Sequence, residues 1–198
     1  MMKIWRLSPK YILARIKNYF YFKNNQNLPW MTKDANNFLI KNLRKDMAVL
    51  EFGSGRSTQF YAYNTNKVYS REHHKEWFDI VTKQIQSFDN IDYKFYDELD
   101  KYADTSDIED NSLDLVIVDG RNRVNCLLNS LDKVKVGGII VLDNAERYML
   151  YPTFSPAKYV RKERNPKWEL AEKILSERFW RHDTTDNVSD TLFFFKRK

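Results

Sequence analysis

Short apolar runs alternate with helix-like spacings along the middle of the chain. The runs are bounded by glycine, aspartate and other polar residues and predict strands at residues 47–52, 67–70, 91–96, 113–118 and 138–142. Apolar residues three or four positions apart predict helices over 32–43, 57–63, 75–88 and 122–134. Because strands and helices alternate, we expect a parallel sheet of βαβ units with helices on both faces.

The end of the chain departs from this alternation. Residues 148–166 contain three prolines and many basic residues, which predicts a loop or a broken helix. A helix follows over 167–178, and two strands at 179–183 and 191–196 are joined by the polar turn 184–190. The predicted fold is therefore a doubly wound α/β structure: a mostly parallel seven-stranded sheet that ends in an antiparallel strand pair.

Residues 1–30 precede this pattern as a basic arm. Seven lysines and arginines but no acid occur before Asp34, so the arm carries the excess behind the net charge of +6. The apolar residues of the arm recur at helical spacing and predict an amphipathic helix; they are Ile4, Trp5, Leu7, Tyr11, Ile12, Ile16, Tyr19 and Phe20. Residues 31–198 are predicted to form one domain.

Three interpretations of the arm follow from its composition. Its apolar stripe packs on the domain as a lid, or forms a homodimer contact, while its lysines lie in water. Alternatively, residues 1–23 bind an anionic membrane surface, which suits basic residues interleaved with Trp and Tyr. Nucleic acid is the weakest interpretation and is not an expected partner, because charge alone specifies no groove or base contact.

The composition limits the class of protein. With 198 residues, 42% hydrophobic and 30% charged, the chain can form one globular core. A single cysteine, Cys126, excludes an internal disulfide and a multi-thiolate metal site, and its place in a predicted helix indicates a core residue. No apolar run approaches the roughly 20 residues of a membrane span. We expect a cytoplasmic protein, with peripheral membrane contact through the arm as an alternative.

A glycine-rich turn follows the first predicted strand and leads into a helix, in the run Glu51-Phe52-Gly53-Ser54-Gly55-Arg56-Ser57-Thr58. Glycines allow a sharp turn and a close approach of backbone to ligand. The third glycine of the dinucleotide fingerprint would fall at Thr58, so pyrophosphate binding is disfavoured. Glu72 ends the next strand at the same sheet edge, where it could accept both hydroxyls of a ribose or cap the following helix.

Together with two later motifs, these residues resemble class I S-adenosylmethionine-dependent methyltransferases over about residues 47–144. The later motifs are Leu115-Val116-Ile117-Val118-Asp119-Gly120 and Gly137-Gly138-Ile139-Ile140-Val141-Leu142-Asp143-Asn144. The resemblance implies a Rossmann-like fold and S-adenosylmethionine as cofactor. It also implies that the turn passes the methionine part, that Glu72 holds the ribose and that His73 borders the adenine. The cofactor-binding positions are then Glu51, Gly53, Ser54, Gly55, Ser57, Thr58, Glu72, His73, Asp119 and Asp97, which could instead be an ordinary strand-end acid.

Acidic side chains follow the fourth and fifth predicted strands, which are neighbours in a doubly wound sheet. Asp119, Asp143 and Asn144 are hard oxygen ligands that suit Mg²⁺ or another divalent cation, and they resemble the metal triad of catechol-type O-methyltransferases. That family has a lysine where this chain has Asn122, so its expected base is missing. Without a metal, Asp119 or Asp143 could accept the hydroxyl proton directly.

A missing motif and a further resemblance both limit the class of acceptor. Methylation of an exocyclic base nitrogen goes with an Asn or Asp-Pro-Pro-aromatic motif, whereas this chain has Asp119-Gly120-Arg121. Pro29-Trp30 with the glycine turn and Glu72-His73 is similar to small methyltransferases associated with surface glycans. Aromatic residues after the fifth strand could form an acceptor wall or belong to the core; they are Tyr148, Tyr151, Phe154, Tyr159 and Trp168.

Basic residues near the predicted site have two interpretations each. Arg121, Arg123 and Arg147 could bind an anionic substrate or pair with carboxylates at helix ends. His182 could act as a base or lie in a surface turn. The sequence thus predicts O-methylation of a sugar hydroxyl, in a small-molecule or glycan acceptor. The alternatives are a metal-dependent, catechol-like small-molecule methyltransferase, or a non-catalytic cofactor- or RNA-binding module.

Overall fold

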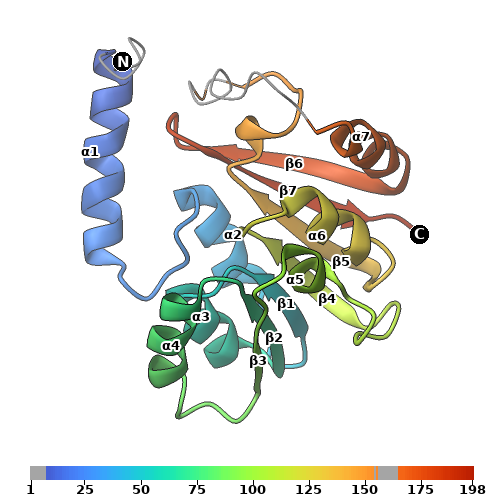
Figure 1. Cartoon of the computed structure of the whole chain (residues 1–198). Helices are drawn as coiled ribbons and strands as arrows, with labels where there is room; N and C mark the ends of the chain where they lie inside the picture. The colour runs from blue at the N-terminus through green and yellow to red at the C-terminus, as the bar shows by residue number, and fades with distance from the viewer. Residues whose placement is uncertain (1–7, 154, 156–164) are drawn as a thin grey trace.

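A single mixed sheet organises the chain in the computed structural model, which describes residues 8–153, 155 and 165–198. Its strand order is β3-β2-β1-β4-β5-β7-β6 (Figure 1). The strands are β1 (Ala48–Phe52), β2 (Lys67–Glu72), β3 (Ile91–Phe95), β4 (Leu113–Val118), β5 (Val134–Asp143), β6 (Phe179–Thr185) and β7 (Asp190–Lys196). Only β7 runs against its neighbours β5 and β6. The predicted seven-stranded, mostly parallel sheet with an antiparallel end is confirmed.

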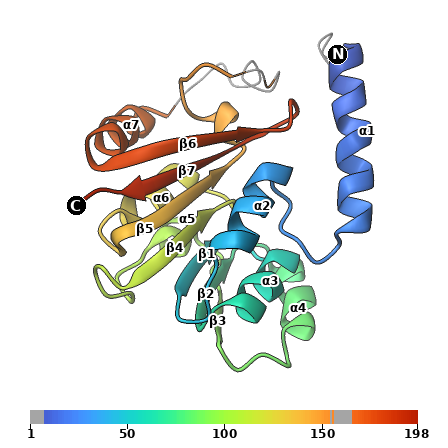
Figure 2. The ribbon, with the colours of Figure 1, turned by 180° about the vertical axis from the view of Figure 1, so that it is seen from behind.

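Helices cover both faces of the sheet, as predicted. The alternation of side chains along each strand creates two separate apolar surfaces. On one face Val49, Leu115 and Val141 pack with residues of α2 (Lys33–Asn42) and α3 (Arg56–Asn64). On the other face the strands pack with α5 (Leu99–Ala103), α6 (Arg123–Ser130) and α7 (Lys167–Arg178). α4 (Lys75–Gln84) contacts β2 and β3 (Figure 2).

Several element bounds differ from the predictions for local reasons. β5 begins at Val134 rather than at residue 138, because a register shift against β4 places an irregularity near Gly137, whose φ is 78°. This early start shortens the crossover helix predicted over 122–134 to α6. α4 ends at Gln84 rather than at residue 88, and a turn follows in which the Phe88 N–H bonds the Ile85 carbonyl. The short helix α5 was not predicted.

The N-terminal arm contains one helix, α1 (Pro9–Asn24), which stands beside the sheet and apart from the other helices in both views (Figures 1 and 2). Ser8 caps it by accepting a hydrogen bond from the Tyr11 N–H. Ala14 is its only buried residue. The prediction that its apolar stripe packs on the domain is wrong for Ile12, Ile16 and Phe20, which are exposed because the helix turns another face inward. Ile4, Trp5 and Leu7 of the same stripe lie outside the described residues.

Two further sequence predictions concern burial. Cys126 is fully buried in the core between α6 and the sheet, so its prediction as a core residue is confirmed. Within the described ranges, no helix has the length and apolar character that crossing a bilayer would require.

Candidate functional site

A large cavity opens at the carboxyl ends of β1, β4 and β5. Its volume is about 910 Å³, and its walls come from the turn after β1, the ends of β4 and β5, the β6–β7 turn and α1. β6 runs parallel to β5, which is why the turn that follows it reaches the same sheet edge. The lining includes Gly53, Ser54, Gly55, Ser57, Asp119, Asp143 and Asn144 among the predicted site residues.

The glycine turn after β1 lies in close contact with the backbone at the end of β4. Gly53 has φ 95°, a conformation that favours glycine, and a Cβ on it would lie 2.9 Å from the Cα of Gly120. A Cβ on Gly120 would in turn collide with the hydroxyl of Tyr102. The two loops can therefore approach one another only because neither glycine carries a side chain.

Glu51 holds this turn in place through hydrogen bonds. Its buried carboxylate accepts hydrogen bonds from Ser57 Oγ at 2.5 Å, Thr58 Oγ1 at 2.6 Å and Ser70 Oγ at 2.8 Å. Burial raises the pKa of Glu51 to about 7, against the lowering effect of the three hydroxyls. Of these predicted cofactor residues, Glu51 and Thr58 are fully buried and hold the turn, whereas Ser57 also lines the cavity.

Glu72 lies against the same turn, as predicted. Oε2 accepts hydrogen bonds from Ser54 N at 3.0 Å and Ser54 Oγ at 2.7 Å, while Oε1 accepts from the His73 and His74 backbone N–H groups at 2.9 Å. The His73 ring lies beside the carboxylate and packs edge-on against Tyr102, and burial lowers the pKa of His73. Ser54 Oγ also lies 2.6 Å from Tyr93 Oη.

Three residues of this end of the cavity were missed by the sequence analysis. Tyr93 reaches Ser54 from β3, where its alternation with Phe95 was the available signal. Trp77 of α4 donates its indole N–H to the Ser54 carbonyl at 2.7 Å. Arg56, directly after the turn, stacks on the rings of Trp30 and Phe22 at 4.9 and 5.6 Å from their centroids.

Asp119 lies at the cavity wall with its side chain 36% exposed and paired to Arg123 at 2.8 Å. Arg123 is buried and also donates to the backbone carbonyls of Asp119, Gly120 and Asp143. It therefore joins the ends of β4 and β5, and its interpretation as an anion-binding residue is wrong. Burial raises the pKa of Asp119, against the lowering effect of Arg123.

Asp143 ends β5 next to this ion pair and is only 2% exposed. Its Oδ1 accepts a hydrogen bond from Thr191 Oγ1 at 2.6 Å. Burial, followed by the charge of Asp119, raises the pKa of Asp143 well above its usual range. The next residue, Asn144, adopts a left-handed conformation with φ 47° and lines the cavity.

The predicted metal triad does not fit a metal site as these side chains are arranged. In this arrangement the Arg123 guanidinium pairs with Asp119 and Thr191 Oγ1 donates a hydrogen bond to Asp143 Oδ1, so both carboxylates are already engaged by protein groups. Among the described residues, no further His, Cys, Asp or Glu side chain joins Asp119 and Asp143 in a group that could hold a metal ion.

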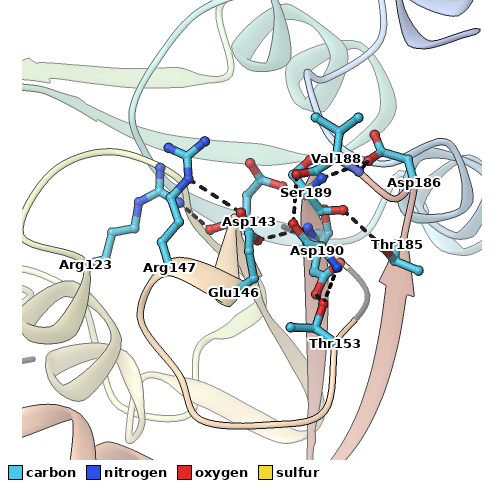
Figure 3. A network of polar contacts seen from close by, with 12 residues as sticks. Arg123, Asp143, Glu146, Arg147, Thr153, Thr185, Asp186, Val188, Ser189 and Asp190 are labelled. Atoms are coloured by element: carbon cyan, nitrogen blue, oxygen red, sulfur yellow. Dashed lines mark hydrogen bonds and ion pairs between the residues drawn. The ribbon is translucent and has the colours of Figure 1, made fainter. Parts of the chain in front are cut away.

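Two further buried acids were missed because they lie outside any motif. Figure 3 shows Asp143, Glu146 and Asp190 gathered where β5, η2 (Ala145–Arg147) and the start of β7 meet. Glu146 Oε2 accepts from the Asp190 N–H at 2.9 Å, and Asp190 Oδ2 accepts from Tyr151 Oη at 2.8 Å and from Thr153. Burial raises the pKa of Glu146 to about 7.

Other predicted residues lie away from the cavity. Asp97 is an exposed residue after β3, and His182 is an exposed residue of strand β6 rather than of a turn. Trp168 is buried in the core, and Tyr148 and Tyr151 are partly buried against that core, so these three do not form the expected acceptor wall. Phe154 and Tyr159 lie outside the described residues.

The aromatic wall comes instead from α1, the loop after it and α4. Tyr19, Phe22, Trp30 and Trp77 line the cavity, together with the basic residues Arg15, Lys23, Arg56 and Arg147. Of the three arginines for which anion binding was considered, only Arg147 reaches the cavity, and it lies 3.5 Å from Glu146. α1 is tied to the domain by a hydrogen bond from Asn18 to Asp186 in the β6–β7 turn at 2.5 Å.

The sequence matches no protein-family model and no curated protein. Solved structures do share its fold. A proposed O-methyltransferase from Klebsiella pneumoniae is 14% identical, with a TM-score of 0.62 over 96% of this chain and 91% of that one. A proposed rRNA methylase from Clostridium thermocellum is 14% identical, with a TM-score of 0.59 over 83% of this chain and 94% of that one.

A third similar structure is described as a SAM-dependent methyltransferase, from Aquifex aeolicus. It is 13% identical, with a TM-score of 0.55 over 84% of this chain and 89% of that one. At these identities the similarity concerns the fold. The chain has the fold of class I S-adenosylmethionine-dependent methyltransferases, as the motifs predicted.

Proposed function

We propose that this protein is an S-adenosylmethionine-dependent methyltransferase that methylates a hydroxyl group, with a sugar of a glycan as the favoured acceptor. The observation that carries the proposal is the pair Asp119 and Asp143 at the cavity wall beside the glycine turn. Burial raises the pKa of Asp119, which makes its carboxylate a stronger base toward a hydroxyl, and raises the pKa of Asp143 further, which favours a protonated carboxyl that can donate a hydrogen bond to the acceptor.

The residues around the glycine turn fit the cofactor. Glu72 offers a carboxylate to ribose hydroxyls, and the close contact of Gly53 with Gly120 keeps side chains out of the space above the turn. His73 lies beside Glu72, where it would border the adenine. When bound, S-adenosylmethionine supplies a methyl group activated by a positively charged sulfur.

The acidic residues then orient the acceptor and take its proton. Arg123 holds the ends of β4 and β5 together, so that Asp119 and Asp143 keep a fixed spacing. Asp119 is the more exposed of the two and is the group we expect to accept the hydroxyl proton. Asp143, oriented by Thr191, stabilises the acceptor by hydrogen bonding.

The opposite wall supports a sugar as acceptor. Flat aromatic faces suit the apolar faces of sugar rings, and Tyr19, Phe22, Trp30 and Trp77 supply four of them. The basic side chains beside them favour a sugar that carries a phosphate or carboxylate group. Similar folds in O-methyltransferases and RNA methylases leave the acceptor class to experiment.

A calorimetric titration with S-adenosylhomocysteine tests the cofactor site. We expect saturable binding by the wild type and at least about tenfold weaker binding by Glu72→Ala, since a hydrogen bond to a charged group contributes about 1.5–3 kcal/mol. Glu76→Ala on α4 is the matched control, because it removes the same charge from an exposed position. A folded wild type that does not bind would overturn the cofactor assignment.

Turnover assays then test the acceptor. Neutral and anionic saccharides and bulk RNA would be offered in parallel, and release of S-adenosylhomocysteine would be measured. Saccharide-dependent release that Asp119→Asn abolishes supports the proposal. Release with RNA alone, or unchanged saccharide turnover by Asp119→Asn, would overturn the acceptor or the assigned base respectively.

A further inference from the structure

The outer face of α1 exposes a row of large apolar side chains. Ile12, Ile16 and Phe20 recur every four residues, and Leu13 flanks them. These four side chains are between 43% and 59% exposed. Monomeric soluble proteins rarely expose a contiguous apolar patch of this kind unless it meets a partner. The row does not face the domain, because the inner face of the helix is the side that carries Ala14 and Asn18.

Positive charge surrounds this row, and α1 itself carries no acidic residue. Arg15, Lys17 and Lys23 lie on the same helix, and the chain contains no acid before Asp34. Two copies of the face would therefore bring like charges together, which disfavours self-association through it. A negatively charged partner with an apolar interior is complementary to both features.

A shallow hollow on the helix adds a second observation. Its volume is about 370 Å³ and all of its lining comes from α1: Tyr11, Ile12, Arg15, Ile16, Tyr19 and Phe20. One guanidinium among apolar and aromatic side chains matches a lipid phosphate above its acyl chains.

We propose that the outer face of α1 docks on an anionic lipid bilayer, with Ile12, Leu13, Ile16 and Phe20 in the interface and the basic side chains at the headgroups. The inner face of the same helix lines the large cavity. Docking therefore brings the cavity to the membrane surface. This inference rests on the helix alone and does not depend on the proposed methyl transfer.

Co-sedimentation of the full chain with lipid vesicles tests the proposal. We expect binding to phosphatidylcholine vesicles that contain phosphatidylglycerol, and at least about tenfold weaker binding to phosphatidylcholine alone, since each basic residue near the surface contributes about 1 kcal/mol. The double variant Ile16→Glu/Phe20→Glu should lose at least another tenfold. Leu170→Glu, 52% exposed on α7, is the matched control and should bind as the wild type does.

Charge and self-association are tested separately. Lys17→Gln should weaken binding to anionic vesicles about fivefold, whereas Lys41→Gln, exposed on α2, should not. Both α1 substitutions alter exposed side chains, so the variants should keep the wild-type thermal unfolding. Equal sedimentation with both vesicle types, or none, would overturn the proposal. A dimer in sedimentation velocity that Ile16→Glu/Phe20→Glu dissociates would assign the face to a second copy and overturn it as well.

Discussion

The Ser54 hydroxyl donates a hydrogen bond to the Glu72 carboxylate, which a ribose hydroxyl would also need as a partner. We therefore expect Ser54→Ala to tighten cofactor binding. Glu72 accepts hydrogen bonds from Ser54 N, Ser54 Oγ and the N–H groups of His73 and His74. A carboxylate has about four lone-pair sites, and these donors fill them. A ribose hydroxyl must displace one donor, and Ser54 Oγ is the only one of the four that does not belong to the backbone.

The size of the effect follows from the partners of that hydroxyl. A hydrogen bond to a charged group contributes about 1.5–3 kcal/mol, and one between neutral groups about 0.5–1.5 kcal/mol. The Ser54 hydroxyl already contacts Tyr93 Oη at 2.6 Å and keeps that partner when it is displaced, so the displacement costs its hydrogen bond to Glu72. This cost is about 1.5–3 kcal/mol, so removal of the hydroxyl should tighten binding at least about tenfold.

Calorimetry with S-adenosylhomocysteine measures this change directly. Tyr93→Phe is the complementary variant, because it removes the alternative partner of the Ser54 hydroxyl and should weaken binding. Opposite signs for the two variants would support the displacement. Weaker binding by Ser54→Ala would refute the reasoning and would mean that the hydroxyl itself contacts the ligand.

Two predictions concern stability. Burial raises the pKa of Glu51 from 4.5 to about 7, so the native state binds more protons than the unfolded state between these pH values. The protonated Glu51 therefore stabilises the native state at low pH, and this stabilisation is lost as the pH rises through 7. Urea unfolding at pH 5 and pH 8 should show that Glu51→Gln removes about 2.5 kcal/mol of the pH dependence. A profile parallel to the wild type would contradict this. Gly120→Ala should lower the free energy of unfolding by about 1–3 kcal/mol through its clash with the Tyr102 hydroxyl. Adding Tyr102→Phe should recover part of that loss, and no recovery would place the strain elsewhere.

The fold was predictable because its signals are local. Strand 113–118 and helix 167–178 were predicted with the bounds that the structure has, since each is a short apolar run or a regular spacing. The same logic placed Gly53, Glu72 and Asp119 at one sheet edge. The start of β5 was missed because the irregularity near Gly137 depends on pairing with β4, which no spacing along a single segment encodes.

The rest of the site depends on contacts between distant segments. The hydrogen bond from Asn18 to Asp186 joins residues 168 positions apart, and without it nothing in the sequence places α1 over the cavity. The arm also carries apolar residues on both faces, such as Phe22 toward the cavity and Phe20 toward solvent. Periodicity alone therefore predicted a helix there without showing which side meets the domain.

The cavity has two walls of different origin, and this has an evolutionary consequence. One wall consists of strand ends, where Gly53 and Asp119 are held by the sheet and by Arg123, so substitutions there disturb the whole fold. The other is a single helix that precedes the sheet and is attached through a few contacts, such as that from Asn18. Substitutions on the inner face of this helix can therefore change the shape and charge of the cavity while the strand-end wall stays intact, so the two walls can diverge at different rates.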